Sequence, residues 1–217
     1  NEGRYGGGMY LYYSNPTLTN VIITDNKAIE RGGGMYSHYS HHTLTQVTIS
    51  NNTAGFTGGS MYLSNSASLT LTNTIIWENS PQSFYLPSGT STITYSDIQG
   101  GWEGEGNINA DPLFTDPENG DYSLQEGSPC IDAGTADTDG DGTDDITDYV
   151  GSAPDMGAYE YESEYDFNLG DVNFDNEINV LDIVLMVSFI LGEPTDEYEY
   201  LASDINQDGL LNILDIV

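Results

Sequence analysis

Oxygen-bearing side chains alternate along two segments near the C-terminus. In each segment they fall at positions 1, 3, 5, 9 and 12 of a twelve-residue loop, and position 7 would contribute its backbone carbonyl. A hard cation such as Ca²⁺ takes roughly six to eight oxygen ligands, and this alternation wraps them around one point. The sequence therefore predicts two calcium sites. They are formed by Asp171, Asn173, Asp175, Glu177, Asn179 and Asp182, and by Asp204, Asn206, Asp208, Leu210, Asn212 and Asp215.

A third acidic segment fits the same template further upstream. No apolar helix follows it, so it would be an isolated calcium loop. The alternative interpretation is a flexible acidic excursion between Ala133 and Asp155. The predicted ligands are Asp137, Asp139, Asp141, Thr143, Asp145 and Asp148.

The charge distribution agrees with cation binding. The chain has 35 Asp and Glu against 3 Lys and Arg, a formal net charge of −32, and no Lys or Arg follows residue 100. Such a segment repels itself unless cations enter it. Nothing in it neutralises phosphates, which excludes nucleic acid and anionic membrane surfaces as partners. There is also no apolar run of about 18 residues for membrane insertion.

The first eighty residues repeat with a period of 26. Gly-Gly-Gly-Met-Tyr at 6–10 and 32–36 returns as Gly-Gly-Ser-Met-Tyr at 58–62. The units are rich in Thr, Ile, Val, Tyr and Asn, which indicates strands joined by tight turns. Stacked units of this kind predict a mainly β fold, a parallel β-helix, with a Met column inside.

Residues at equivalent positions of successive units form columns along the stack. These columns indicate which side chains face the interior. Three columns recur as apolar residues and are predicted to face the interior, whereas the mixed column Ile22, Thr48, Ile75 is predicted to face outward. Asn20, Gln46 and Asn73 would form left-handed corners, with their side-chain amides bonding along the stack. The inward columns are Leu18, Leu44, Leu71; Val21, Val47, Thr74; and Ile23, Ile49, Ile76.

This repeat resembles the right-handed parallel β-helix, or pectate-lyase-like, superfamily, specifically its secreted bacterial members. The motifs Gly-Gly-Trp-Glu-Gly-Glu-Gly-Asn at 100–107, Asp-Pro-Leu-Phe at 111–114 and Ser-Pro-Cys-Ile-Asp-Ala-Gly at 128–134 are similar to the last irregular coils and the C-terminal cap of such proteins. The resemblance implies a solenoid over residues 1–161 whose cap covers its open end.

A linker at 162–169 leads to a different pattern. Residues 178–191 are apolar at helical spacing, and 197–203 indicate a second short helix or turn. Each acidic loop carries Leu-Asp-Ile-Val at its end, and the two loops lie 33 residues apart. Residues 170–217 therefore resemble a type I dockerin, a small α-helical, EF-hand-like module. This implies a cohesin-like partner, bound Ca²⁺, and an extracellular or cell-surface location in a prokaryote.

Two features depart from that family. Loop positions 10 and 11, where cellulosomal dockerins usually carry small hydroxyl residues, hold Val180, Leu181, Ile213 and Leu214. These apolar residues are expected to contact a different cohesin, another copy of the chain or a neighbouring domain. The second loop is followed by barely one helical turn, so the rest of this half module is expected after residue 217 or from a neighbour.

Catalysis finds little support in the sequence. The three basic residues lie apart from any acidic cluster, and the histidines (38, 41 and 42) are expected to be exposed turn residues without a carboxylate pair. Cys130 lies among small and apolar residues, which indicates a buried structural thiol. Tyr10, Tyr36 and Tyr62 would form an outward ladder that either stacks on itself or binds a polysaccharide.

Two functions follow as hypotheses. The first is a non-catalytic, secreted, calcium-stabilised structural or adhesive protein, whose β-helix rod carries a dockerin-like attachment module. The second is the C-terminal part of a dockerin-tethered polysaccharide lyase or glycoside hydrolase, whose catalytic coils would precede residue 1.

Overall fold

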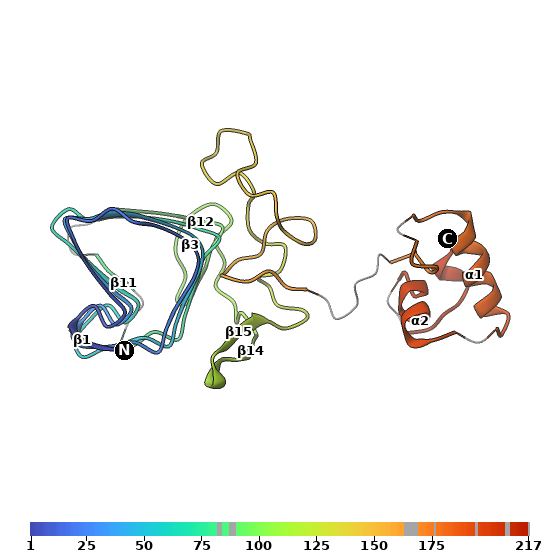
Figure 1. Ribbon diagram of the computed structural model, residues 1–217, viewed down its shortest axis with the longest axis horizontal. Coiled ribbons are helices and arrows are strands. Elements are labelled where there is room, and N and C mark those ends of the chain that lie inside the picture. The colour runs from blue at the N-terminus through green and yellow to red at the C-terminus, as the bar shows by residue number, and fades with distance from the viewer. Residues whose placement is uncertain are drawn as a thin grey trace. The chain divides into compact units, whose positions relative to one another are not determined.

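The chain folds into two compact units, Asn1–Tyr161 and Glu162–Val217. The computed structural model describes residues 1–81, 84–86, 90–162, 169–175, 177–193, 195–206 and 209–216. No helix in this described part of the chain combines the length and the apolar character that a membrane crossing requires. Figure 1 labels elements of both units.

The regular structure of the first unit consists mainly of β-strands, and that of the second is helical. The strands are β1 (Glu2–Tyr5), β2 (Met9–Tyr12), β3 (Thr17–Thr24), β4 (Lys27–Arg31), β5 (Met35–His38), β6 (His41–Ser50), β7 (Thr53–Ala54), β8 (Met61–Ser64), β9 (Ser68–Thr72), β10 (Ile75–Trp77), β11 (Phe84–Tyr85), β12 (Thr90–Thr94), β13 (Asp97–Ile98), β14 (Phe114–Asp116) and β15 (Asp121–Leu124). The helices are α1 (Val180–Ile190) and α2 (Glu197–Ser203), with 3₁₀ turns η1 (Pro117–Asn119) and η2 (Ile213–Asp215).

Parallel pairing stacks the repeats into a β-helix, as the sequence predicts. Three sheets run along the stack, with strand orders β1-β4-β7, β2-β5-β8-β11 and β12-β9-β6-β10-β13, the last joined by β3 on β6. Met9 pairs with Met35 and Met35 with Met61, so the 26-residue period is the length of one coil. Viewed down the stack, the coils superimpose on one closed outline (Figure 1).

The interior of the stack contains the predicted apolar columns. Met35, Leu44, Val47, Ile49 and Leu71 are completely buried. Their alternation along each strand places every second side chain inside, which confirms the predicted orientation.

A buried asparagine ladder, which the sequence reasoning missed, also runs along the stack. Asn52 Oδ1 accepts hydrogen bonds from the N–H and the side-chain amide of Asn26, both at 3.0 Å. Asn79 Oδ1 accepts the two equivalent bonds from Asn52, also at 3.0 Å. The ladder satisfies backbone groups at a turn where the sheets change direction.

The predicted corners adopt left-handed backbone conformations, with φ of 55° at Asn20, 52° at Gln46 and 51° at Asn73. The prediction that their amides bond along the stack is wrong for Gln46 and Asn73. Gln46 Nε2 donates to Glu160 at 3.1 Å, and the Asn73 amide exchanges two 2.8 Å bonds with the backbone of Thr135. Both side chains point away from the stack, toward the segment that follows the coils.

That later segment, residues 109–161, is called the strap here. It was expected to cover the open end of the helix, but most of it packs along the side of the coils beside β3 and β10 (Figure 1). The outward column residue Ile75 is fully buried in a second core formed by Phe114, Tyr122, Cys130 and Met156, among others. The mixed column therefore faces outward as predicted, yet it is covered by the strap.

The end of the stack is closed by a shorter stretch before the strap. Ile108 forms a parallel bridge with Asp97, and the N–H of Tyr95 donates to Glu105 O at 2.7 Å. Trp102 packs its ring against Phe84, 5.3 Å away, over the interior of the last coil. Residues 102–108 thus cover the open end of the helix, a role that was expected of the whole C-terminal cap.

The second unit contains two helices and a final 3₁₀ turn. Asn179 caps α1 by accepting from the N–H of Leu181, and Asp182 completes a capping box. The same box recurs at η2, with Asn212 and Asp215 in the equivalent places. The duplicated sequence thus produces duplicated local structure.

Candidate calcium-binding loops

The first acidic loop is closed by its own polar side chains. Asp171 Oδ1 accepts from the N–H of Asp175 at 3.1 Å, and Asp175 Oδ1 accepts from the N–H of Glu177 at 2.9 Å. Asn173 Oδ1 accepts from the N–H of Asp175 at 2.9 Å. The predicted ligands at positions 1, 3 and 5 therefore curl the loop around its own centre.

The carboxylate at position 12 holds the two ends of this loop together. Asp182 is buried and accepts from the N–H groups of Val172 at 2.9 Å and Asn179 at 2.8 Å. Burial alone would raise its pKa, but the backbone N–H bonds outweigh burial and hold the pKa of Asp182 below its usual value. The group is thus ionised at neutral pH, as a metal ligand must be.

The position 9 residue has a structural role in both loops. Asn179 Nδ2 donates to Glu177 O at 3.1 Å, while Asn212 Nδ2 donates to Leu210 O at 2.8 Å. Each Asn oxygen caps the helical turn that follows. Position 9 commonly reaches calcium through a water molecule, which is compatible with these caps.

The second loop repeats the geometry of the first. Asp204 Oδ2 accepts from the N–H of Gly209 at 2.8 Å, and Asp215 Oδ2 accepts from the N–H of Asn212 at 2.8 Å. Asn206 donates its N–H to Asp215 Oδ1 at 3.4 Å. The predicted ligand Asp208 lies outside the described residues.

Two contacts that α2 makes within this unit were not predicted from the sequence. The N–H of Gly170 donates to Ala202 O at 2.8 Å. The hydroxyl of Tyr200 donates to Gly209 O at 3.0 Å and accepts from the N–H of Leu211 at 3.4 Å. Tyr200 therefore ties α2 to the second loop.

The apolar residues at positions 10 and 11 are exposed. Val180, Leu181, Ile213 and Leu214 are each 57–67 % exposed within this unit. Exposed apolar residues of this size, at equivalent places in both halves, form a surface that suits a partner.

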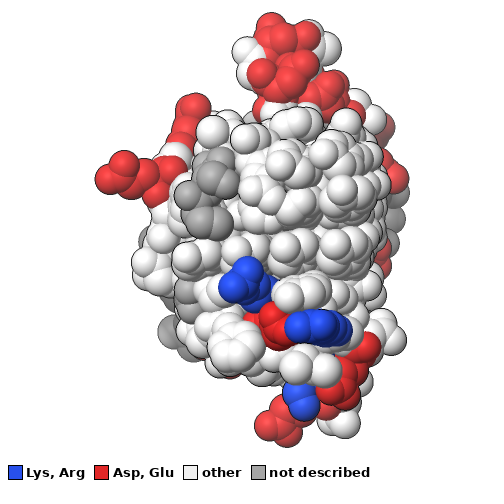
Figure 2. Space-filling view, turned by 90° about the vertical axis from the view of Figure 1, so that its left-hand side faces the viewer, with Lys and Arg blue, Asp and Glu red and all other residues white. Residues whose placement is uncertain are grey.

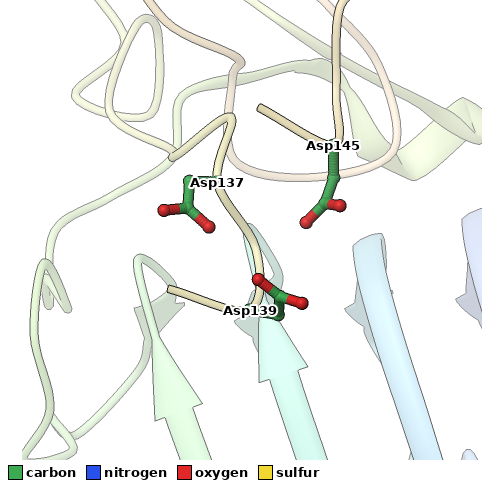
Figure 3. A group of neighbouring side chains, drawn as sticks. All are labelled: Asp137, Asp139 and Asp145. Atoms are coloured by element: carbon green, nitrogen blue, oxygen red, sulfur yellow. The ribbon is translucent and has the colours of Figure 1, made fainter. Parts of the chain in front are cut away.

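The third acidic loop brings three of its predicted ligands together. Carboxylate oxygens of Asp137, Asp139 and Asp145 lie within 4.8 Å of one another (Figure 3). Asp141 and Asp148 are not members of this group. Hydrogen bonds from the hydroxyl and the N–H of Thr138 lower the pKa of Asp145.

Backbone N–H groups organise the same loop. The Asp137 carboxylate accepts from the N–H of Gly140 at 2.7 Å and of Gly142 at 2.8 Å, and Asp141 Oδ1 accepts from the N–H of Thr143 at 2.8 Å. The loop begins just after Thr135, which is bonded to the corner residue Asn73. The predicted third loop is thus anchored to the coils.

The tyrosine ladder lies outward and stacks on itself. Tyr10 and Tyr36 are 5.2 Å apart with a 1° angle between ring planes, and Tyr36 and Tyr62 are 5.1 Å apart at 4°. Tyr62 also stacks on Tyr85, and only 7 % of its surface is exposed. The faces of the inner rings are therefore occupied by their neighbours, and mainly the ring edges remain for a polysaccharide.

The two arginines have structural partners, and one histidine is buried. Arg4 pairs with Glu30 at 2.7 Å, and Arg31 donates to the Tyr62 hydroxyl at 3.2 Å. His42 is buried inside the coils, so its prediction as an exposed turn residue is wrong. Burial, with a smaller contribution from His41, lowers the pKa of His42 to about 4.

One buried acid pairs with the single cysteine. Cys130 is fully buried, as predicted, and its Sγ lies 3.4 Å from Asp97 Oδ2. Burial raises the pKa of Asp97 to about 6 and also raises the pKa of the thiol. A thiol with a raised pKa is a poor nucleophile.

Comparison with known protein families divides the chain in the same way. Residues 2–108 match the model of the right handed beta helix region, and residues 169–217 match the model of the dockerin type I domain. Neither the curated proteins nor the solved structures provided a match. Type I dockerin domains bind calcium, typically bind cohesin partners, and are typically extracellular or at the cell surface.

Proposed function

The chain joins a right-handed β-helix to a type I dockerin domain, and from this combination we propose a non-catalytic, secreted attachment protein. The β-helix is the rigid part. The dockerin is the calcium-dependent end that binds a cohesin-like domain or another copy of the protein. The observation that carries the proposal is the pair of acidic loops with matching hydrogen bonds and matching exposed apolar residues.

Calcium is proposed at both dockerin loops, through the side chains predicted from the sequence. Residues 169–217 contain eleven carboxylates and no basic side chain, so the unit gains stability when cations enter it. A site with a dissociation constant near 10⁻⁵ M in millimolar calcium stabilises by about 2.7 kcal/mol. Two such sites equal much of the net stability of a small domain. A third ion is proposed at the group of Asp137, Asp139 and Asp145.

The apolar surface at loop positions 10 and 11 is proposed to contact the partner. Val180 and Leu181 in one half, and Ile213 and Leu214 in the other, cannot exchange the hydroxyl hydrogen bonds usual at these positions. A partner with an apolar patch suits them better than a polar one. The double variant Val180→Ser/Leu181→Ser is expected to weaken attachment at unchanged calcium affinity, whereas Leu191→Ser at the far end of α1 serves as the control.

The non-catalytic part of the proposal is supported by the environment of the two arginines. In the described coils, Arg4 is paired with Glu30, and Arg31 lies over the ring of Tyr62. Neither stands beside the acidic group at residues 137–145, where a lyase would need its base. The alternative, a tethered polysaccharide lyase or hydrolase, predicts release of oligosaccharides from polygalacturonate or alginate, and such release would refute the non-catalytic proposal.

Calcium titration of the purified chain tests the central claim. Isothermal titration calorimetry should detect two calcium sites that Asp171→Ala and Asp204→Ala remove one at a time, and a third that Asp137→Ala removes. Glu193→Ala changes the charge equally at an exposed turn and should leave all sites intact. Chelation should also abolish the helical circular dichroism of the second unit. Unchanged helical signal and melting in chelator would contradict the calcium proposal.

A further inference from the structure

One outward side of the β-helix consists of hydroxyl side chains in register, and it is called the threonine face here. It is built from β12, β9 and the first halves of β6 and β3, which form the upper side of the coil outline in Figure 1. Pairing aligns its members across four coils. The columns are Thr17, Thr43, Thr70, Thr92; Thr19, Thr45, Thr72, Thr94; and His41, Ser68, Thr90. Thr72 is buried, so the first column, with three exposed members, is the one most open to a ligand.

The geometry of this face is a regular two-dimensional array. Neighbouring members of a column lie about 4.7–4.9 Å apart, and columns lie about 6.6–6.8 Å apart along each strand. Threonine side chains are stiff because Cβ is branched, so each hydroxyl and methyl repeats in nearly the same orientation. Thr17, Thr43 and Thr92 are exposed, and their hydroxyls make no hydrogen bond to other described residues.

The threonine face is also free of formal charge. Its columns contain no carboxylate, Lys or Arg, although the chain as a whole carries −32. The adjoining side, built on β2-β5-β8-β11, is likewise a broad uncharged surface whose acidic and basic side chains gather at its borders (Figure 2). The field of the whole chain repels anionic ligands, so an occupant of this face must be uncharged.

Aromatic rings border the face at the corner where the first two coils turn into it. Tyr13 and Tyr39 stack at 4.9 Å, and they are 65 % and 42 % exposed. Their positive φ values of 50° and 52° fix this corner. Exposed rings beside a row of hydroxyls provide an apolar contact next to a hydrogen-bonding one.

We propose that the threonine face binds an uncharged, extended β-linked polysaccharide whose chain runs along the β-helix axis. Each sugar ring of such a chain is close in length to one coil, so its hydroxyls meet the threonine columns once per coil. The apolar C–H faces of the sugar contact the threonine methyls and the Tyr13–Tyr39 corner. At the exposed Thr17, Thr43 and Thr92, each bond replaces water on a hydrated hydroxyl, which keeps the cost of desolvation low.

The proposal concerns a surface outside the calcium loops and does not depend on them. A depletion assay with the full chain in millimolar calcium measures binding to microcrystalline cellulose and to insoluble β-mannan, with polygalacturonate as the acidic comparison. The double variant Thr43→Val/Thr70→Val removes two hydroxyls at nearly constant volume and with high strand propensity. It is expected to bind the uncharged polysaccharides about tenfold more weakly.

Thr53→Val is the matched control, because Thr53 is exposed on β7, in a different sheet, and undergoes the same substitution. Its affinity should equal that of the unchanged chain. Absence of binding to both uncharged polysaccharides would overturn the proposal. It is equally overturned by binding that the threonine variant leaves unchanged, or by preferential binding to polygalacturonate.

Discussion

The buried asparagine ladder offers a sharp test of what holds the coils together. The Asn52 side chain is completely buried and takes part in five hydrogen bonds. Its oxygen accepts two from Asn26, and its amide donates to Ile23 O at 2.7 Å, Ser50 O at 3.0 Å and Asn79 Oδ1 at 3.0 Å. The substitution Asn52→Ala removes all five at once.

The size of the effect follows from these contacts. The buried N–H of Asn26 loses its acceptor, which costs about 2 kcal/mol, and each of the four other bonds contributes about 0.5 kcal/mol or more. The expected loss is therefore about 4 kcal/mol of the free energy of unfolding of the first unit. For a unit of this length, this lowers the melting temperature by about 10 °C.

Urea unfolding followed by tryptophan fluorescence measures this loss directly. Both tryptophans of the chain, Trp77 and Trp102, lie in the first unit, so the signal reports on the coils alone. The control is Asn119→Ala, which removes one exposed bond to Asp116 at 2.7 Å and should cost less than about 1 kcal/mol. If Asn52→Ala changed stability no more than this control, the ladder would not be a principal support of the stack.

Three further outcomes are expected. Because burial raises the pKa of Asp97 to about 6, above about 3.9 in the unfolded chain, stability falls as pH rises through this window. Asp97→Asn should therefore raise the free energy of unfolding at pH 7.5, and this gain should disappear below about pH 4, as measured by urea titration. Burial lowers the pKa of His42 to about 4, so stability falls as pH drops from about 6.5 to 4, and His42→Leu should flatten that slope. The buried Cys130 should react with a thiol reagent only in denaturant, and rapid reaction in buffer would show that the strap opens.

Periodicity was sufficient to predict the β-helix. The 26-residue repeat identifies the coil, and alternation within it places Leu44, Val47 and Ile49 inside, as observed. Local backbone preference also placed the left-handed corners correctly at Asn20, Gln46 and Asn73. These features depend on contacts within one coil and between neighbours, which a repeat encodes directly.

The position of the strap could not be predicted from the repeat. Residues 109–161 have no repeat, and their contacts with Gln46, Thr48 and Ile75 join segments more than forty residues apart in sequence. The mixed column was the relevant signal. Ile22 and Ile75 are large apolar residues on an outward face, and such a face needs a cover.

In the acidic loops, too, contacts between residues close in sequence could be predicted, whereas contacts that depend on the tertiary fold could not. The hydrogen bonds of Asp171, Asp175 and Asp182 follow from spacing alone, and so do the helix caps at Asn179 and Asn212. The bond from Tyr200 to Gly209 does not, because it depends on how α2 folds back on the second loop. The prediction that His42 is exposed was wrong because side chains alternate between the two faces of the strand. His42 occupies an inward position, paired with Leu69.

The strap changes how the coils respond to force. In an ordinary solenoid each repeat contacts only its neighbours, so a pull at one end peels coils away singly. Here the strap contacts three successive coils, with Tyr122 bonded to Asp25, Glu160 to Gln46 and Thr135 to Asn73. Tension from the dockerin reaches Tyr161 first, and therefore loads bonds across several coils together rather than the last coil alone. Under tension, the coils of the β-helix should consequently unfold together and not one at a time.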